Sequence, residues 1–390
     1  MISLDATQPI YDVPDSSRVP DDVQDAPVAG SHLAQIHSGI PPLLFGAAAL
    51  SEYYNGDDHL RSDIPFRTVR LALRYGINGF DTSPYYGASE LVLGSILRAL
   101  APEYPRSSYQ IMSKCGRYGR EKKDFDYSPA TLRKSLARTL ERLGTSYLDT
   151  LYLHDVEFVA SPVHPSDLLG DPIAAIETEH GRAAWGLRPE DAEKVHGDGD
   201  EQILTAFGYP LPILLRLAVL IRARFAEPVD VVLSYSHYTL QNDAFAAYVP
   251  HFTSPSGAHV GQLFCASPLS MGFFSPNVPS WSPVTPGMRE ARARAIQICE
   301  TANWPGGLTN LALGFGLRRS EGGGIPAHVP TVIGLSRLEE VHESVKIWGQ
   351  VNGPWAQRSD AEARQALENQ VRDCFVQSGW FNWSWASPSE

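Results

Sequence analysis

The chain has 390 residues, a net charge of −12 and an isoelectric point near 5.5. A chain this acidic repels a phosphate backbone and an anionic membrane surface, so we expect neither a nucleic acid nor a membrane as a partner. Hydrophobic residues make up 43% and charged residues 19%, which excludes a disordered chain and permits a large core.

Two further features bear on the compartment. No segment approaches the ~18 apolar residues of a membrane span, and the acidic, proline-containing N-terminus differs from a signal peptide. The four cysteines show no spacing typical of a zinc or redox site, and we expect them to be reduced and buried, with no metal bound. These patterns predict a soluble, cytoplasmic protein.

Taken from the N-terminus, residues 1–38 are rich in Asp, Pro, Ser and Val and show no period, which predicts an extended N-terminal arm and leaves open a structural arm that lies on the body. The residues from 39 to 390 then form the main domain. The first strand lies in the apolar run 42–50, and Gly76 is expected to end a helix over 64–75. Ser128 and Pro129 begin another helix as its N-cap and first position, and Gly144 ends it.

Strands and helices alternate along the rest of the main domain. We expect strands at 42–50, 77–82, 109–115, 147–153, 202–207, 229–235, 261–266 and 329–333. We expect helices at 64–75, 89–97, 129–143, 172–179, 211–225, 243–248, 287–303, 308–318 and 338–348. About eight strand–helix units predict an α/β fold in which one domain forms a closed (β/α)8 TIM barrel.

Three segments exceed a minimal barrel. Residues 180–200 are polar and contain glycines, which predicts a surface insertion. Residues 275–286 contain four prolines and are expected to loop over the end of the seventh strand. A helix from about 354 to 374 precedes a run of aromatic residues that we expect to pack on the barrel: Trp380, Phe381, Trp383 and Trp385.

Polar residues follow three of the predicted strands, where a barrel brings strand ends to one mouth: Asp81 and Tyr86, Lys114, and His154. Taken singly, Asp81 could cap a turn, Tyr86 could be a packed aromatic and His154 a core histidine. Lys114 is different because a lysine inside a barrel needs a carboxylate partner, for which Asp81 is the best candidate.

That pair would have chemical consequences. Lys114 would lower the pKa of Tyr86 from ~10 toward neutrality, which would make it a proton acceptor for an alcohol. His154 would orient the same substrate oxygen. Since no side chain accepts a hydride, this chemistry requires a nicotinamide cofactor, and we expect NAD, with NADP possible.

The residues resemble the aldo-keto reductase family, whose signature has the form of residues 79–87 with Glu90 following. The resemblance extends through residues 113–116 and 153–155. It implies a (β/α)8 barrel with a catalytic tetrad of Asp81, Tyr86, Lys114 and His154. We expect the substrate pocket to include Tyr85, Ala48 and Tyr118.

Segments 113–118, 154–158, 229–238 and 266–272 are similar to the sugar-dehydrogenase branch of this family, the L-galactose dehydrogenases and NAD-dependent D-arabinose 1-dehydrogenases. The resemblance implies oxidation of an aldose at its anomeric carbon to an aldonolactone, a step toward ascorbate or erythroascorbate. It also implies a set of cofactor-binding residues: Tyr235, Ser267, Leu269, Met271, Gly334, Ser336, Arg337 and Glu340.

The cofactor preference rests on the last strand and the helix after it. Leu335 and Ser336 cannot clamp a 2′-phosphate and Glu340 would repel one, which favours NAD, whereas Arg337 could reverse this preference. The backbone donors of residues 334–336 are expected to suit phosphate oxygens. A Ser-Asn pair that many relatives carry after the fifth strand is missing from residues 205–210.

Three functions stay open on the sequence. The first is an NAD-dependent aldose 1-dehydrogenase, a monomer or weak homo-oligomer with a small-molecule substrate. The second is an NADPH-dependent aldo-keto reductase for a larger carbonyl compound of specialised metabolism, because substrate choice in barrels depends on loops. The third is a cofactor-binding regulatory subunit without turnover, against which the intact tetrad argues.

Overall fold

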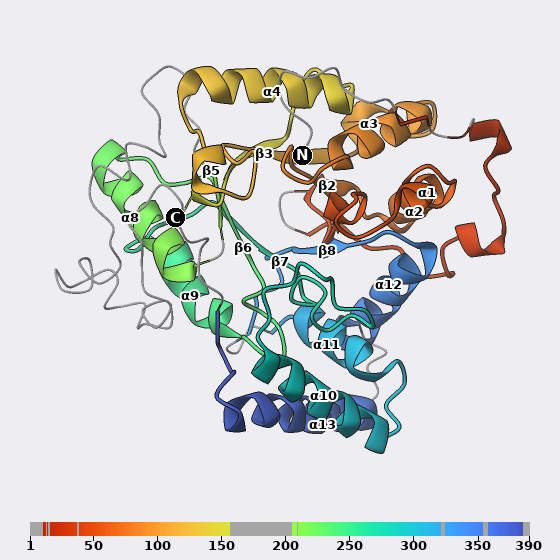
Figure 1. The fold of residues 1–390 in the computed structure, drawn as a ribbon, viewed down its shortest axis with the longest axis vertical. Helices are drawn as coiled ribbons and strands as arrows, with labels where there is room; N and C mark the ends of the chain where they lie inside the picture. The colour runs from red at the N-terminus through yellow and green to blue at the C-terminus, as the bar shows by residue number, and fades with distance from the viewer. Residues whose placement is uncertain are drawn as a thin grey trace.

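Eight parallel strands form a closed barrel at the centre of the computed structural model, and helices surround it (Figure 1). Each strand pairs with the next, and β8 returns to pair with β1, where Phe45 faces Ile333. The strands are β1 (Leu43–Gly46), β2 (Gly79–Asp81), β3 (Gln110–Cys115), β4 (Thr150–His154), β5 (Thr205–Gly208), β6 (Val231–Tyr235), β7 (Gln262–Ala266) and β8 (Thr331–Gly334). The predicted (β/α)8 barrel is confirmed.

The structure describes residues 11, 12, 14, 16–36, 39–156, 205–208, 210–320, 324–353 and 358–384. Its helices there are α1 (Asp57–Leu60), α2 (Ile64–Tyr75), α3 (Ser89–Leu100), α4 (Pro129–Leu143), α8 (Leu211–Phe225), α9 (Ala244–Thr253), α10 (Pro286–Thr301), α11 (Gly307–Leu317), α12 (Leu338–Asn352) and α13 (Arg358–Gln377). The helix predicted at 172–179, the insertion at 180–200 and Trp385 lie outside the described residues.

Local signals set most helix ends. Helix α2 ends at Gly76, whose φ of 88° is left-handed, and α4 ends at Gly144 with a φ of 66°. Ser128 occupies the predicted N-cap position of α4, but its side chain makes no capping bond; Asp126 instead accepts from the Ser128 N–H at 2.8 Å. Helix α9 runs beyond its predicted end at 248, through Pro250, because Phe252 is fully buried.

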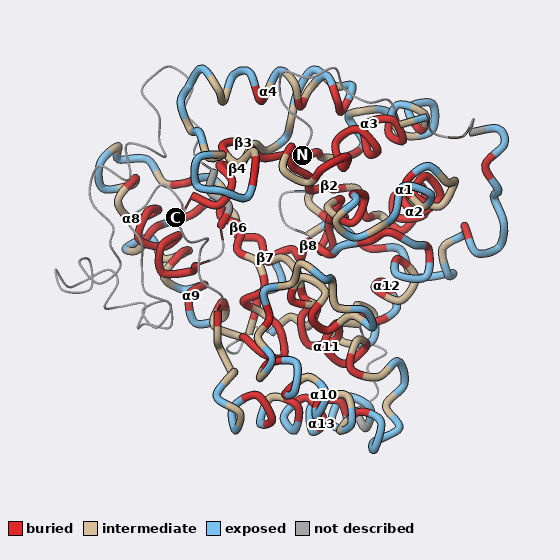
Figure 2. The backbone as a smooth tube through the Cα atoms, in the orientation of Figure 1, coloured by how far each residue is buried: buried red, intermediate tan, exposed pale blue. Residues whose placement is uncertain are grey.

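Two kinds of apolar layer hold the barrel together, and Figure 2 shows the strands and parts of the surrounding helices as buried. Inside it, the buried side chains come from alternate positions of the strands: Leu44, Met112, Tyr152, Leu233, Phe264 and Val332. Outside it, the strands pack against helices, as Phe80 does against the cluster that includes Val69 and Val92. Lys114 follows Met112 on the inward side of β3, so the strand itself directs its ammonium group into the barrel.

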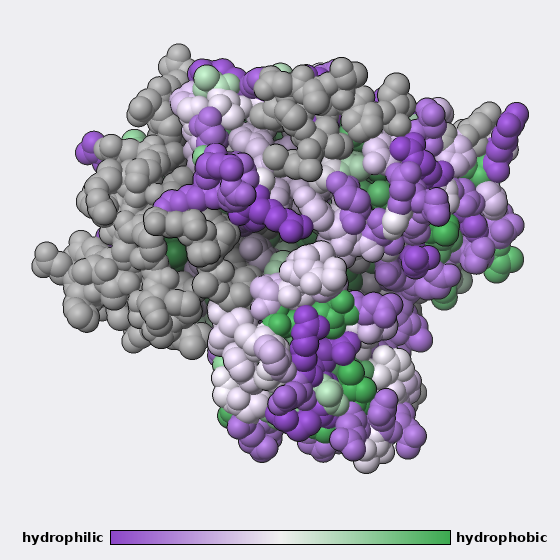
Figure 3. Space-filling model, viewed as in Figure 1, coloured by the Kyte–Doolittle hydropathy of each residue, from purple (hydrophilic) through white to green (hydrophobic). Residues whose placement is uncertain are grey.

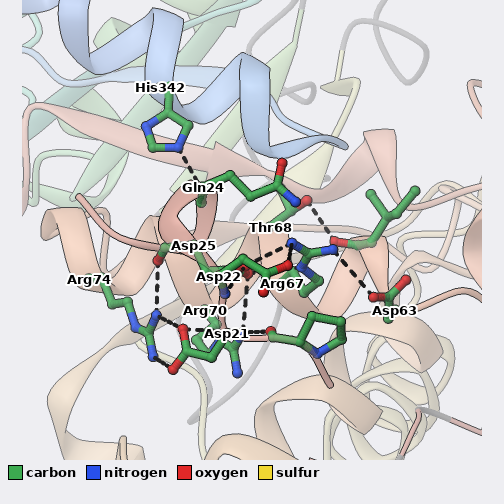
Figure 4. Close-up of polar contacts among 12 residues, drawn as sticks. Asp21, Asp22, Gln24, Asp25, Asp63, Arg67, Thr68, Arg70, Arg74 and His342 are labelled. Atoms are coloured by element: carbon green, nitrogen blue, oxygen red, sulfur yellow. Dashed lines mark hydrogen bonds and ion pairs between the residues drawn. The ribbon is translucent and has the colours of Figure 1, made fainter. Parts of the chain in front are cut away.

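The N-terminal arm contacts α2 and α12 around residues 20–25, where His342 of α12 bonds to the Gln24 carbonyl at 2.9 Å (Figure 4). Asp25 is fully buried there and accepts hydrogen bonds from Arg67 at 2.7 Å and 2.9 Å and from Arg70 at 3.1 Å. Leu33 and Val19 join the core cluster around α2. This part of the arm is therefore built into the body rather than free in solvent.

The proline-rich loop and the C-terminal segment also pack on the barrel. Trp281 donates to the carbonyl of Tyr53 at 2.9 Å, which joins the loop after β7 to the loop after β1. Helix α13 lies along α10, and the Gln241 amide donates to the carbonyls of Trp380 and Trp383. The predicted packing of these two aromatic residues is confirmed.

The described surface in Figure 3 is mostly hydrophilic, with hydrophobic side chains in small groups, the clearest of them near α11. Within the described ranges, no helix combines the length and apolar character needed to cross a membrane.

Candidate active site

The carboxyl ends of β2, β3 and β4 bring polar side chains to one mouth of the barrel. Asp81 is the last residue of β2 and His154 the last of β4, and Lys114 is the last but one of β3. Tyr86 lies in the turn between β2 and α3, where Tyr86 N–H donates to the Ser83 carbonyl at 3.0 Å. The fold thus brings these four residues together from separate stretches of the chain.

Lys114 occupies the centre of this group. Its ammonium nitrogen donates to Asp81 Oδ1 at 2.7 Å and to the Thr82 carbonyl at 2.9 Å, and the side chain is fully buried. The same nitrogen lies 4.6 Å from the centre of the Tyr86 ring. The two side chains expected to pair are therefore in contact, and the ammonium lies against the tyrosine.

The pKa of Tyr86 departs from the expectation. Burial raises the Tyr86 pKa well above 10, and the carboxylates of Asp81 and Asp155 raise it further. The prediction that Lys114 lowers this pKa toward neutrality is wrong for the chain by itself. The physical reason is that Asp81 offsets the charge of Lys114, while desolvation of the phenolate remains.

Burial also shifts the pKa values of the Asp81–Lys114 pair. It raises the pKa of Asp81 and lowers that of Lys114, and in both groups the attraction of the partner opposes the shift. Asp81 Oδ2 has no hydrogen-bond partner among the described residues, so Lys114 is the main contact that stabilises this carboxylate.

His154 is held in a defined orientation. Its Nδ1 lies 2.9 Å from the hydroxyl of Ser83, and its ring meets those of Tyr86 and Tyr85 edge to face at 5.5 Å and 5.7 Å. Burial, together with Lys114 and Arg117, lowers the pKa of His154 well below 6.5. The imidazole is therefore neutral at physiological pH and can share one proton with a substrate oxygen.

A second buried ion pair, between Glu90 and Arg142, supports β3 from the side that faces the helices. Glu90, the second residue of α3, is fully buried and accepts from Ser113 at 2.7 Å, Thr139 at 2.9 Å and Arg142 at 3.1 Å. Ser113 directly precedes Lys114, so this network fixes the strand that carries the central lysine.

The expected pocket residues lie in different surroundings. Tyr85 borders the site, since its ring meets those of Tyr86 and His154. Ala48 lies in the short turn that follows β1. The Tyr118 hydroxyl accepts a hydrogen bond from the N–H of Gly116 at 3.0 Å. The neighbouring residue Arg117 donates to the hydroxyl of the pocket residue Tyr85.

The loops after β6 and β7 contain residues that we expected to contact the cofactor, and also two hydroxyls that the sequence did not indicate. Tyr235 ends β6, and Ser267, Leu269 and Met271 follow β7, where Ser267 has a φ of 58° and Met271 of 50°. The buried hydroxyls of Ser236 and Ser270 lack hydrogen-bond partners within the described part of the chain. Left-handed non-glycine residues and unpaired buried hydroxyls are typical of a ligand site.

The turn between β8 and α12 differs from the expectation. Glu340 accepts the N–H of Ser336 at 2.6 Å and that of Arg337 at 3.1 Å, so these donors are not directed at a phosphate. Glu340 thus acts as a helix cap, and its charge sits at the helix start. Gly334 is exposed, and a side chain there would meet only Ala49, at 3.8 Å, which leaves space beside the strand end.

Together these features define a barrel oxidoreductase site. The tyrosine, the neutral histidine and the buried lysine can move one proton, and the hydroxyls on the loops after β6 and β7 suit a polar cofactor such as a nicotinamide dinucleotide. No group of side chains in the described ranges is arranged to hold a metal ion.

Comparison with known proteins agrees with this class. The model of the aldo/keto reductase family matches residues 42–179. L-Galactose dehydrogenase of Arabidopsis thaliana is 34% identical over 77% of this chain and 82% of its own length. D-Arabinose 1-dehydrogenase of Saccharomyces cerevisiae is 30% identical over 90% of this chain and 94% of its own.

Two solved structures share the fold. The glycerol dehydrogenase AKR11B4 of Gluconobacter oxydans has a TM-score of 0.51 and 18% identity, covering 95% of this chain and 99% of that one. The aldo-keto reductase AKR11C1 of Bacillus halodurans has a TM-score of 0.50 and 19% identity, covering 86% and 96%. The chain belongs to the aldo/keto reductase family, whose oxidoreductases use a nicotinamide cofactor on small carbonyl substrates.

Proposed function

We propose that the protein is an aldose 1-dehydrogenase, which oxidises the anomeric carbon of a small sugar to an aldonolactone. The observation that carries the proposal is the contact of Tyr86 with both Lys114 and His154 at the mouth of the barrel. The sugar class rests on the two relatives, which are named for L-galactose and D-arabinose and match most of the chain.

The chain's residues divide the proton chemistry among them. When bound, the nicotinamide ring supplies the hydride acceptor. Tyr86 takes the proton of the anomeric hydroxyl, and the neutral His154 hydrogen-bonds to the same oxygen and orients the C–H bond. Lys114 stabilises the phenolate form of Tyr86 that accepts this proton, because its nitrogen lies against the ring.

The cofactor is proposed to be NAD. Glu340 places a carboxylate at the start of α12, and a 2′-phosphate near that helix end would meet a like charge. The hydroxyls of Ser236 and Ser270 would hold polar groups of the cofactor. Arg337 is exposed beside Glu340 and is the residue that would favour NADP.

The proposal is tested by mixing the purified protein with NAD and either D-arabinose or L-galactose and following absorbance at 340 nm. Reduction of NAD with both sugars or either one supports it. Tyr86→Phe should then lose turnover by about 10²- to 10⁴-fold and still bind the cofactor. No absorbance gain with any aldose, in a protein that binds NAD, would reject the sugar assignment.

A second candidate is a reductase for a larger carbonyl compound. It is favoured by the aromatic rings that gather beside the site: Tyr53 lies 6.1 Å from Tyr85, and Trp281 meets Tyr54 edge to face at 5.4 Å. Turnover of an aromatic ketone with NADPH, without turnover of sugars, would select this candidate.

A further inference from the structure

We propose that Arg117, held by Asp155, is a positioning residue of the acid/base centre, which fixes Tyr85 beside Tyr86 and supplies the second positive charge of the site. The proposal rests on the proposed function of Tyr86 and His154. It deepens that function by assigning a role to a buried ion pair that the tetrad does not use.

Arg117 lies two residues beyond β3, and its side chain contacts Asp155, Tyr85, the Gly119 carbonyl and the Phe125 ring. One guanidinium nitrogen pairs with Asp155 Oδ2, another donates to the Tyr85 hydroxyl at 2.9 Å, and the guanidinium carbon lies 3.8 Å from the centre of the Tyr85 ring. A planar guanidinium that stacks on a ring and also bonds to its hydroxyl leaves the ring little freedom. Tyr85 is thereby held between Arg117 and His154.

Asp155 is placed for this task at a conformational cost. It directly follows β4, its φ is 52°, and its side chain is almost fully buried. Left-handed backbone is unfavourable for a residue with a side chain, so it persists where the surroundings require it. The Tyr127 hydroxyl donates to the carbonyls of His154 and Asp155 and holds this turn.

The pair sits at the edge of the proton-transfer group. Asp155 Oδ2 lies 3.7 Å from His154 Nε2, and His154 and Tyr86 are in ring contact. Among the described residues, the charged or titratable groups around Tyr86 include Asp81 from β2, Lys114 from β3, His154 and Asp155 from β4 and the turn after it, Tyr54 from the loop after β1, Tyr85 and Arg117. Tyr235 of β6 also faces Arg117.

The electrostatic consequence has a definite sign. Arg117 lowers the pKa of Tyr86 against the effects of burial and the carboxylates, and it also lowers the pKa of His154. Removal of the guanidinium should therefore make the phenolate harder to form and the imidazole easier to protonate. Both changes would reduce oxidation at neutral pH.

The test compares Arg117→Met and Arg117→Lys with Arg120→Met, a matched control that removes an exposed arginine of the same loop. In wild type and each variant, kcat and kcat/KM are measured from pH 6 to 10 with whichever substrate the protein turns over. Arg117→Met should displace the rising limb of kcat/KM for oxidation toward higher pH, which lowers kcat/KM by about tenfold at each pH on that limb, and should displace the falling limb for reduction in the same direction. In Arg117→Lys, the limb of kcat/KM should stay close to its wild-type pH while kcat falls. Arg120→Met should match wild type in both.

A second readout needs no substrate, so it distinguishes failure of this proposal from failure of the sugar assignment. The His154 imidazole is followed by NMR from pH 4.5 to 8 and assigned with His154→Gln. The pKa of His154 should be higher in Arg117→Met than in wild type and in Arg120→Met, because a positive charge that lowers this pKa has been removed. An unchanged His154 titration and unchanged pH limbs in a folded Arg117→Met variant would overturn the proposal, whatever the loss in rate.

Discussion

Lys114→Met offers the sharpest test of the buried pair. The change removes the ammonium that lies 2.7 Å from Asp81 Oδ1 and leaves the carboxylate buried, with its other oxygen unpaired among the described residues. Removal of one partner of a buried pair costs about 3 to 5 kcal/mol, because the remaining charge has lost its counter-charge. We expect a loss of this size in the free energy of unfolding at pH 8.5.

The loss should depend on pH with a definite sign. Burial raises the pKa of Asp81, and without Lys114 nothing at this contact opposes the rise. A group with a raised folded pKa favours the folded state below its unfolded pKa of ~3.9, and that contribution disappears as the pH rises through the folded value. The variant should therefore be closer to wild type in stability at pH 6 than at pH 8.5.

The assay is urea unfolding at both pH values, followed by circular dichroism and tryptophan fluorescence. Asp81→Asn/Lys114→Met is the matched control: with both charges gone, it should recover most of the stability while remaining inactive. A Lys114→Met protein as stable as wild type at pH 8.5 would refute the argument that this pair is charged and mutually dependent.

Four further predictions concern the site and its supports. The log of kcat/KM for sugar oxidation should rise with a slope near one from pH 7 to 9, because the reaction needs the Tyr86 phenolate and burial raises that pKa; a plateau near pH 7 would contradict this. Glu90→Gln should lower the free energy of unfolding by about 3 kcal/mol, seen as a lower urea midpoint, because Arg142 would lose its buried partner. Glu340→Gln should reduce the preference for NAD over NADP by about fivefold, or about 1 kcal/mol, in paired kcat/KM measurements, and an unchanged ratio would remove Glu340 from cofactor selection. Asp25→Asn should cost about 1.5 to 3 kcal/mol at pH 7. Because the pKa of Asp25 is lowered to about 2, the difference from wild type should shrink as the pH falls from about 4 toward that value, and a pH-independent difference would argue against the ion pairs with Arg67 and Arg70.

Local sequence determined the secondary structure and its order. Helix α2 starts and ends at the predicted residues, because Gly76 can adopt the left-handed turn and the amphipathic pattern spans the helix. The alternation of strand and helix was enough to predict a closed barrel. Even the contact between Asp81 and Lys114 was foreseeable, because a lysine inside a barrel requires a nearby acid.

Only the tertiary structure decided the pKa values of the site residues and the partners that their side chains contact. The pKa of Tyr86 depends on its depth of burial and on the sum of several carboxylates and cations, none of which a strand pattern specifies. The contact of Asp25 with Arg67 joins residues 42 apart, and that of Arg117 with Asp155 joins residues 38 apart. Side-chain contacts across such separations follow from how the chain packs. The sequence by itself determined which residues reach the mouth of the barrel. Only the packed structure determined the partners of these residues and the electrostatics of the site.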